Sequence, residues 1–443
     1  MKISRTLSRS LLITFALNCF VALPMAQAVG PDTDGAIPGA NNGEGIGVLV
    51  SLTTGTWNSG IGFLSLRNNT TGNFNTANGG GSLFFNTTGE QNTATGAGAL
   101  LSNTTGGSNT ANGAFALISN TTGRFNTATG DQALFRNTMG DYNTANGYVA
   151  LTNNIDGPGN TATGAYALSF NSSGEANTAM GVAALFVNTI GSHNTANGWN
   201  ALNVNTTGSG NTATGYKALI NSTTGENNTA VGNLALALNS TGGGNIALGT
   251  SAGFNLTTGD NNIDIGNVGV GAESDTIRIG TVETHTATYV AGIFGATVTD
   301  GAPVIVDNQG HLGTAVSSAR FKDEIKPMDK ASKAILALKP VTFHYKTDAK
   351  GTPQFGLIAE EVAKVNSHLV IRDRDGQPYT VRYEAVNAML LNEFLKEHHR
   401  VQAQQNEIDA LKTELKDQRA LIEKVSAQIE LSKSSPRTVL NDQ

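Results

Sequence analysis

The sequence predicts a mainly β protein: a parallel β-solenoid or β-roll of 17-residue repeats, a β-rich neck, a small α/β domain and a C-terminal coiled-coil helix. Three observations lead to this prediction. A glycine-rich motif recurs at a fixed step, the charged residues gather in the C-terminal part, and the last helix carries apolar residues at every seventh position. Gly makes up 53 of the 443 residues and charged residues only 14%. Both values depart from those of an average domain, which argues against one ordinary enzyme fold filling the chain.

The charge divides the chain into two differently built regions. Residues 30–270 hold 15 Asp, Glu, Lys and Arg, whereas residues 271–443 hold 44. The net charge is −6, so the chain as a whole is not basic. Nucleic acid is therefore not an expected partner.

The N-terminus has the pattern of a secretory signal peptide. Lys2, Arg5 and Arg9 precede the apolar stretch 11–23, and small residues follow at Ala26-Gln27-Ala28. We expect a signal peptide over 1–28 and an N-terminal segment over 29–57. The protein is then exported to the cell surface or the extracellular space, with the periplasm left open.

Removal of this segment also removes the one cysteine of the chain, Cys19, so the mature protein has no disulfide. No later stretch is apolar for long enough to cross a bilayer, so we expect no membrane span after signal removal. The histidines have no metal-ligand spacing, and we expect no metal and no cofactor.

The repeat predicts the solenoid over 58–270. Its motif is Asn-Thr-Ala-x-Gly-x-x-Ala-Leu, and ten copies, with looser ones at Asn58, Asn245 and Asn262, follow one another without insertion. They begin at Asn58, Asn75, Asn92, Asn109, Asn126, Asn143, Asn160, Asn177, Asn194, Asn211, Asn228, Asn245 and Asn262. Gly occupies the fifth position of every copy, Leu the ninth of eleven, and a second Gly the fifteenth of nearly all. Each copy should therefore occupy the same structural slot.

A repeat of this length suits one solenoid coil of two short strands and two turns, with the glycines at positive φ. Within Asn-Thr-Ala-x-Gly, alternation places Asn, Ala and Gly on one face and Thr on the other. We expect the Leu column to fill a narrow interior and stacked Asn and Thr to form hydrogen-bonded ladders. At about 4.8 Å per coil, thirteen coils give a rod about 60 Å long.

These repeats resemble the heads of trimeric autotransporter adhesins, which are left-handed parallel β-rolls with shorter repeats. Because one coil has a small core, we expect three chains to bury each other's inner faces. Disorder is the first alternative, and the strict phasing opposes it. An ice-binding face of Thr columns is the second, and the mixture of Asn and Thr at the fourth position opposes it.

The neck is expected over 271–316. Its β-rich stretches are 276–279, 288–293 and 304–306, and the last is followed by a turn over 307–310.

An α/β domain is expected over 317–393. A helix is predicted over 328–338, a strand over 341–346, and a strand running into a helix over 354–365. A hairpin is predicted from residues 370–371 and 379–383, with its turn at Asp375-Gly376.

Three motifs in this domain resemble the intramolecular chaperone domain of phage tailspikes and endosialidases, the S74 peptidase family. They are Ser317-x-x-Arg320-x-Lys322, then Leu338-x-Pro340-Val341-x-Phe343-x-Tyr345-Lys346, then Gly356-x-Ile358-Ala359-Glu360-Glu361-Val362, with Val381-x-Tyr383 after them. Two positions depart from the family pattern. Ser318 stands where many members have Asp, and Glu360 stands where Gln is usual.

The resemblance implies self-cleavage between Val316 and Ser317 by a Ser-Lys dyad, with Ser317 as nucleophile and Lys322 as base. A hydroxyl needs an adjacent base near pH 7. Lysine serves as one when burial or a neighbouring cation such as Arg320 lowers its pKa. Without the resemblance, a serine at the start of a strand and a solvated lysine would be the better interpretation.

Apolar residues at heptad spacing predict a coiled coil over 394–431, and a disordered tail is expected over 432–443. The seam residues are Phe394, Val401, Ile408, Leu415, Ile422 and Ile429. The pattern leaves dimer or trimer open, and an amphipathic helix packed on its own domain is the alternative.

Together these features predict an exported homotrimeric fibre whose C-terminal domain aligns the chains and then cuts itself free. The alternative is an adhesin or receptor-binding fibre with an uncleaved trimerisation cap, for which a host-surface receptor or a glycan is the further partner. A glycan-cleaving enzyme is disfavoured, because the 11 acidic residues of 30–270 form no recurring carboxylate pair.

Overall fold

The computed structural model describes residues 37–293 and 295–433. The predicted signal peptide and most of the predicted tail lie outside these residues. The chain divides into two compact units, one ending at Thr288 and one beginning at Tyr289, and each is described by itself.

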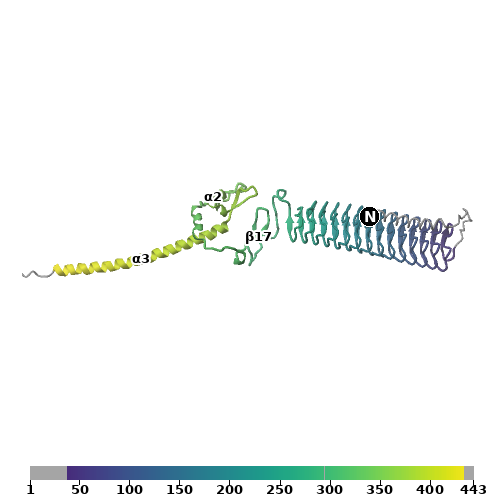
Figure 1. Ribbon diagram of the computed structural model, residues 1–443, viewed down its shortest axis with the longest axis horizontal. Helices are drawn as coiled ribbons and strands as arrows, with labels where there is room; N and C mark the ends of the chain where they lie inside the picture. Colours follow the sequence, from purple (N-terminus) through teal and green to yellow (C-terminus); the bar gives the residue numbers. More distant parts are fainter. Residues whose placement is uncertain (1–36, 294, 434–443) are drawn as a thin grey trace, which may run out of the picture. The chain divides into compact units, whose positions relative to one another are not determined.

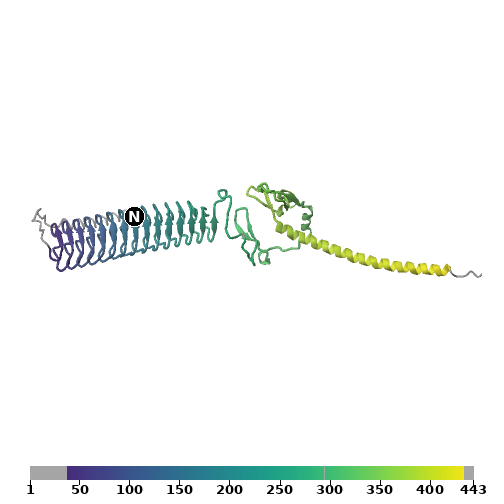
Figure 2. The same ribbon diagram turned by 180° about the vertical axis from the view of Figure 1, so that it is seen from behind.

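The first unit is a parallel β-solenoid, which confirms the predicted fold class. Among the described residues, fifteen three-residue strands form one sheet in chain order, and Figures 1 and 2 show the stacked coils. Successive strands pair one whole repeat apart, as in Thr161 opposite Thr178. The strands are β1 Asn42–Glu44, β2 Ser59–Ile61, β3 Thr76–Asn78, β4 Thr93–Thr95, β5 Thr110–Asn112, β6 Thr127–Thr129, β7 Thr144–Asn146, β8 Thr161–Thr163, β9 Thr178–Met180, β10 Thr195–Asn197, β11 Thr212–Thr214, β12 Thr229–Val231, β13 Ile246–Leu248, β14 Ile263–Ile265 and β15 Ile277–Ile279.

The sheet extends beyond the counted copies at both ends. At its start, β1 pairs with β2 at the usual step, so a further coil precedes Asn58. At its end, β15 pairs with β14 at a smaller step, with Ile277 opposite Ile263. The last coil is therefore shorter than the others.

Each coil has one strand, so the prediction of two strands per coil is wrong. In the coil that begins at Asn160, alternate residues after the strand take positive φ: Gly164 at 129°, Tyr166 at 62° and Leu168 at 50°. The backbone amides of this segment bond to both neighbouring coils. Tyr166 N donates to the preceding coil and Leu168 N to the following one. These bonds between coils offset the cost of left-handed non-glycine residues, about 1–2 kcal/mol each.

The two repeat glycines have different roles, which corrects the prediction that both take positive φ. Gly164, at the fifth position, has φ of 129°. At the fifteenth position, Gly174 does not have a positive φ and is required because it has no side chain. A Cβ built there would lie 2.4 Å from the Gly191 carbonyl oxygen of the next coil. Each closing glycine lets two coils approach to a separation that no side chain permits.

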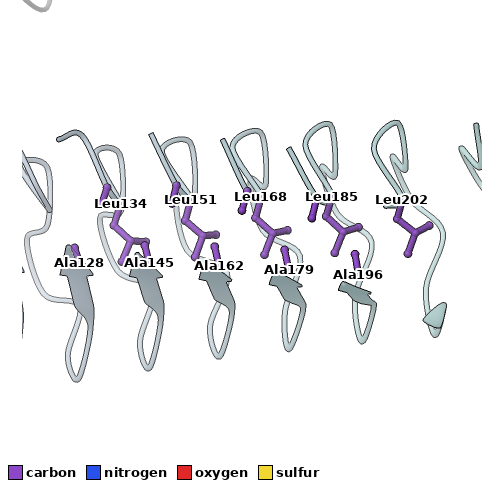
Figure 3. Packing of buried hydrophobic residues seen from close by; sticks show 14 of the residues in the cluster. Ala128, Leu134, Ala145, Leu151, Ala162, Leu168, Ala179, Leu185, Ala196 and Leu202 are labelled. Carbon is purple, nitrogen blue, oxygen red and sulfur yellow. The ribbon is translucent and has the colours of Figure 1, made fainter. Parts of the chain in front are cut away.

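The interior of the solenoid is closed within one chain. The third, eighth and ninth positions, such as Ala162, Ala167 and Leu168, are fully buried. Figure 3 shows each Leu of the column directed toward the Ala of the strand. The expectation that three chains bury each other's inner faces is therefore wrong, because neighbouring coils already cover each inner face.

Two ladders of buried asparagine run along the solenoid, as predicted. At the first position, Asn177 Nδ2 donates to Asn160 Oδ1 at 3.1 Å and to the Gly191 carbonyl at 2.9 Å. At the twelfth, Asn171 Nδ2 donates to Asn154 Oδ1 at 2.7 Å. The Thr ladder uses the main chain, since its hydroxyls donate to carbonyls of the next coil. The ladders satisfy most of these buried polar groups. The twelfth-position ladder is interrupted at Ser222, which leaves Asn205 Oδ1, Ser222 Oγ and Asn239 Oδ1 without hydrogen-bond partners among the described residues.

The predicted neck is only partly strand. Residues 276–279 contain β15, and β16 (Val304–Val306) forms an antiparallel hairpin with β17 (Leu312–Thr314) around the predicted turn. The stretch 288–293 is not a strand. Its β-branched residues find no partner strand among the described residues, and a strand without a ladder is not stable.

The second unit contains the predicted α/β elements in the expected order. The expected helix over 328–338 is a 3₁₀ helix, and the expected strand over 341–346 ends early, at Phe343. The strand-helix pair over 354–365 and the hairpin around Asp375-Gly376 are confirmed. The elements are η1 Ala319–Phe321, η2 Asp329–Ala337, β18 Val341–Phe343, β19 Gln354–Gly356, α2 Ala359–Val365, η3 Ser367–Leu369, β20 Val370–Arg372, β21 Pro378–Val381 and α3 Tyr383–Lys433.

Helix α3 is 51 residues long and is drawn in yellow in Figure 1. It extends slightly past the predicted end of the coiled coil, to Lys433, and Met389 is its one buried residue among those described. No described helix is both long enough and apolar enough to span a membrane.

Candidate functional site

The structure brings the two predicted dyad residues together. Lys322 Nζ lies 3.2 Å from Ser317 Oγ, at hydrogen-bond distance. Ser317 follows β17, and the short helix η1 then reverses the chain. Lys322 N closes this turn by donating to the Ala319 carbonyl at 3.1 Å. The spacing of the motif thus places the amine over the hydroxyl because a single 3₁₀ turn lies between them.

The dyad is open to solvent within one chain. Ser317 and Lys322 are both exposed, and Val316, whose carbonyl precedes the nucleophile, is 56% exposed. The Arg320 guanidinium, expected to influence the lysine, lies 4.6 Å from the ring centre of Phe321. Hydroxyl, amine and peptide bond are thus grouped at one exposed turn.

The second unit has a small core and a large apolar surface. Its buried hydrophobic residues are Val362, Leu369, Val370, Val381 and Met389. Against these, Phe355 is 80% exposed, Tyr379 74% and Leu336 73%. An open groove of about 730 Å³ runs past Ile335, Val341, Phe355 and Leu390. Exposed apolar surface of this extent is typical of a protein that packs against a partner.

The heptad residues of α3 are also exposed. The seam residues are between 45% and 65% exposed, and they are Phe394, Val401, Ile408, Leu415, Ile422 and Ile429. An isolated helix gains little stability in water without a packed face. The exposed seam is compatible with the predicted coiled coil.

A buried polar cluster that sequence reasoning missed joins η2 to α3. Ser332 Oγ is fully buried and lies 2.5 Å from Glu393 Oε1, 2.7 Å from Asn392 Nδ2 and 3.0 Å from Lys396 Nζ. Lys396 also donates to the Asp329 carbonyl. The hydrogen bonds from Lys396 and Ser332 lower the pKa of Glu393. The two segments lie far apart in the sequence, so no local pattern indicates the cluster.

This cluster also contains a serine beside a lysine, but its setting differs from that of Ser317. Ser332 is enclosed, and its oxygen is already engaged by three side chains. A peptide carbonyl has no access to it. The cluster therefore fastens η2 to α3.

The histidines form no second site. His311 lies 3.8 Å from Asp307 in the β16–β17 turn, where backbone amides of residues 311 and 309 lower the pKa of Asp307. In the described ranges, no three His, Cys, Asp or Glu side chains are grouped so as to hold a metal ion.

Comparison with known proteins identifies the C-terminal segment. Residues 317–371 match the family model of peptidase S74, described as the chaperone of endosialidase. The match begins at Ser317 and includes Lys322, and it follows the repeat region. No curated protein matches the chain.

Proposed function

We propose that the chain is an exported, trimeric fibre whose C-terminal module assembles three chains and then cleaves the Val316–Ser317 bond. The chain joins a β-solenoid to a segment that matches the chaperone of endosialidase, which suggests a tailspike-like fibre. The observation that carries the finer proposal is the 3.2 Å contact between Lys322 Nζ and Ser317 Oγ at the first residue of that segment.

The cleavage proceeds by transfer of an acyl group. Lys322, as the free amine, takes the proton of the Ser317 hydroxyl, and Oγ attacks the Val316 carbonyl carbon. The C–N bond breaks, the nitrogen of Ser317 takes up a proton, and an ester joins Val316 to Oγ. Water then hydrolyses the ester, which leaves a Val316 carboxylate and restores the hydroxyl on a new N-terminal Ser317.

Trimer formation would also control the timing of this reaction. A solvated lysine is protonated near pH 7, and burial lowers a lysine pKa. In one chain the dyad is exposed and apolar surface surrounds the unit. Packing of three units would bury the dyad, so that cleavage follows assembly. The C-terminal unit would therefore stay attached to each chain until the three chains are aligned.

Mass spectrometry of the purified full chain tests the cleavage. We expect two fragments, the second running from Ser317 to Gln443. Ser317→Ala removes the nucleophile, and Lys322→Arg keeps the charge but removes the base. Both variants should stay intact and still form trimers.

Two neighbouring substitutions serve as matched controls. Ser318→Ala removes an adjacent hydroxyl, and Lys326→Arg alters an exposed lysine that pairs with Glu324. Both should be cleaved like the wild-type chain. An intact trimeric wild-type chain would favour the retained cap of an adhesin instead, and cleavage of Ser317→Ala would show that the dyad assignment is wrong.

A further inference from the structure

The last coils of the solenoid contain a charge where the interior is otherwise apolar. The third position of the repeat is the Ala column of the core, and Ala247 is its last member. The strand register then places Asp264 opposite Ala247, and Arg278 opposite Asp264. An acidic side chain thus occupies the slot that a methyl group fills in the preceding coils.

Asp264 is enclosed and has no hydrogen-bond partner. It is 1% exposed, and neither carboxylate oxygen has a partner within residues 37–293 and 295–433. Gly269 approaches so closely that a Cβ there would lie 2.8 Å from Oδ2. A buried carboxylate without a partner is costly when ionised and far less so when protonated.

The nearby cation is engaged elsewhere. Arg278 makes a two-pronged contact with Glu273, with Nε 2.8 Å from Oε1 and Nη2 2.7 Å from Oε2. Glu273 also accepts from Val270 N at 2.8 Å. Glu273 and Arg278 are the charged groups that face Asp264 from the elements around it. The Arg278 guanidinium is therefore near two carboxylates but hydrogen-bonds to that of Glu273 and not to that of Asp264.

We propose that Asp264, Glu273 and Arg278 form a pH-dependent lock on the last coil, closed while Asp264 is protonated and loosened when it ionises and competes with Glu273 for Arg278. The lock spans β14 and β15, shortly before the boundary between the two units. The three residues of the lock all belong to the solenoid unit, so the lock does not depend on the proposed cleavage.

The direction of the effect follows from linkage. Burial, and then the charge of Glu273, raise the pKa of Asp264 from 3.8 to about 6. The closed coil therefore holds the proton more tightly than the open one, so stability is full in acid and falls as pH rises from 3.8 to 6. Between pH 5 and 7 the opening equilibrium should increase about tenfold.

Hydrogen exchange on the full chain tests the lock. Protection of residues 263–279 is compared with that of the central coil 160–176 at pH 5 and 7, after correction for intrinsic exchange. The wild-type ratio should fall about tenfold with rising pH, by the linkage just given. Asp264→Asn keeps the shape without the charge, and Asp264→Ala restores the residue of the column. Both should remove the pH response.

Two further variants separate the lock from simple burial. Glu273→Gln frees Arg278 for Asp264, which should lower the pKa of Asp264 and reduce the response between pH 5 and 7. Glu90→Gln removes an exposed carboxylate elsewhere and should leave the response unchanged. The proposal is overturned by a wild-type ratio that does not vary with pH, by a response that survives Asp264→Asn, or by an unaltered response in Glu273→Gln.

Discussion

The space between two neighbouring coils determines which residue fits at some positions of the repeat. The fifteenth position holds Gly because a carbonyl of the next coil occupies the place of a Cβ, as at Gly174. The sixth position is open, and at Gly80 the nearest atom to a built Cβ is the Phe63 carbonyl oxygen, 4.0 Å away. Glycines at different positions of one repeat therefore differ in whether a residue with a side chain can replace them.

Gly174→Ala should destabilise the solenoid, by about 1–3 kcal/mol, because the new methyl group forces two coils apart. Gly80→Ala is the matched control. Other coils already have Ala at the sixth position, so its effect should remain within about 0.5 kcal/mol. Denaturant unfolding of the full chain, followed by circular dichroism, measures both. Equal effects of the two substitutions would contradict the role assigned to Gly174.

Helix α3 has little internal support for its length of 51 residues. Only Met389 is buried among its described residues, and the heptad seam faces solvent within one chain. The buried cluster around Ser332 fixes the first part of the helix to η2. The rest of the helix has no buried residue among those described, and the proposed trimer would supply partner helices for it.

Ile422→Asp should abolish the trimer, because it places a charge in the seam where the helices would meet. Ala420→Asp introduces the same charge nearby, outside the seam, and should leave the trimer intact. Light scattering after size-exclusion chromatography gives the mass of each assembly. Trimers of Ile422→Asp would exclude the coiled coil as the assembling element.

The sequence predicted elements well where the pattern itself specifies the partner. The constant step of the repeat pairs each strand with an equivalent strand, and Asp375-Gly376 indicates the turn of its hairpin. Prediction failed where the partner is distant or absent. Residues 288–293 have β propensity but no ladder, and the short helix at 329–337 has a periodicity that does not distinguish 3₁₀ from α.

The candidate site was predictable in part. The motifs indicated Ser317 and Lys322, and the turn η1 provides the contact between them. The Ser332 cluster could not be predicted, since it depends on the packing of segments far apart in the sequence. Asp264 was detectable as an acidic residue in the Ala column, although its missing partner is visible only in the structure.

At the scale of the molecule, the two units differ in how they satisfy their apolar groups. The solenoid buries continuous Ala and Leu columns within one chain, whereas the second unit has a core of five buried hydrophobic residues among those described. Both units also expose large apolar side chains, such as Trp57 and Phe355. In the proposed function, the second unit drives assembly, because its heptad helix supplies a repeating exposed apolar face. The solenoid of one chain has no unique alignment with another, because a shift of one coil presents nearly the same surface.

A chain that ends at Val316 should fold its solenoid yet fail to form uniform trimers. The full chain should give trimers with all three chains in register. Analytical ultracentrifugation and electron microscopy of the two proteins make the comparison. Uniform, heat-resistant trimers from the shortened chain would show that alignment needs no C-terminal module.

The asparagine ladders also set a unit of length for the protein. Along most of the stack each amide meets its equivalent one coil away, and the twelfth-position ladder is interrupted at Ser222. Loss or duplication of a whole coil keeps equivalent asparagines opposite one another, whereas an insertion of another length within the stack would displace them. Whole coils are therefore the natural unit in which the repeat region can lengthen or shorten.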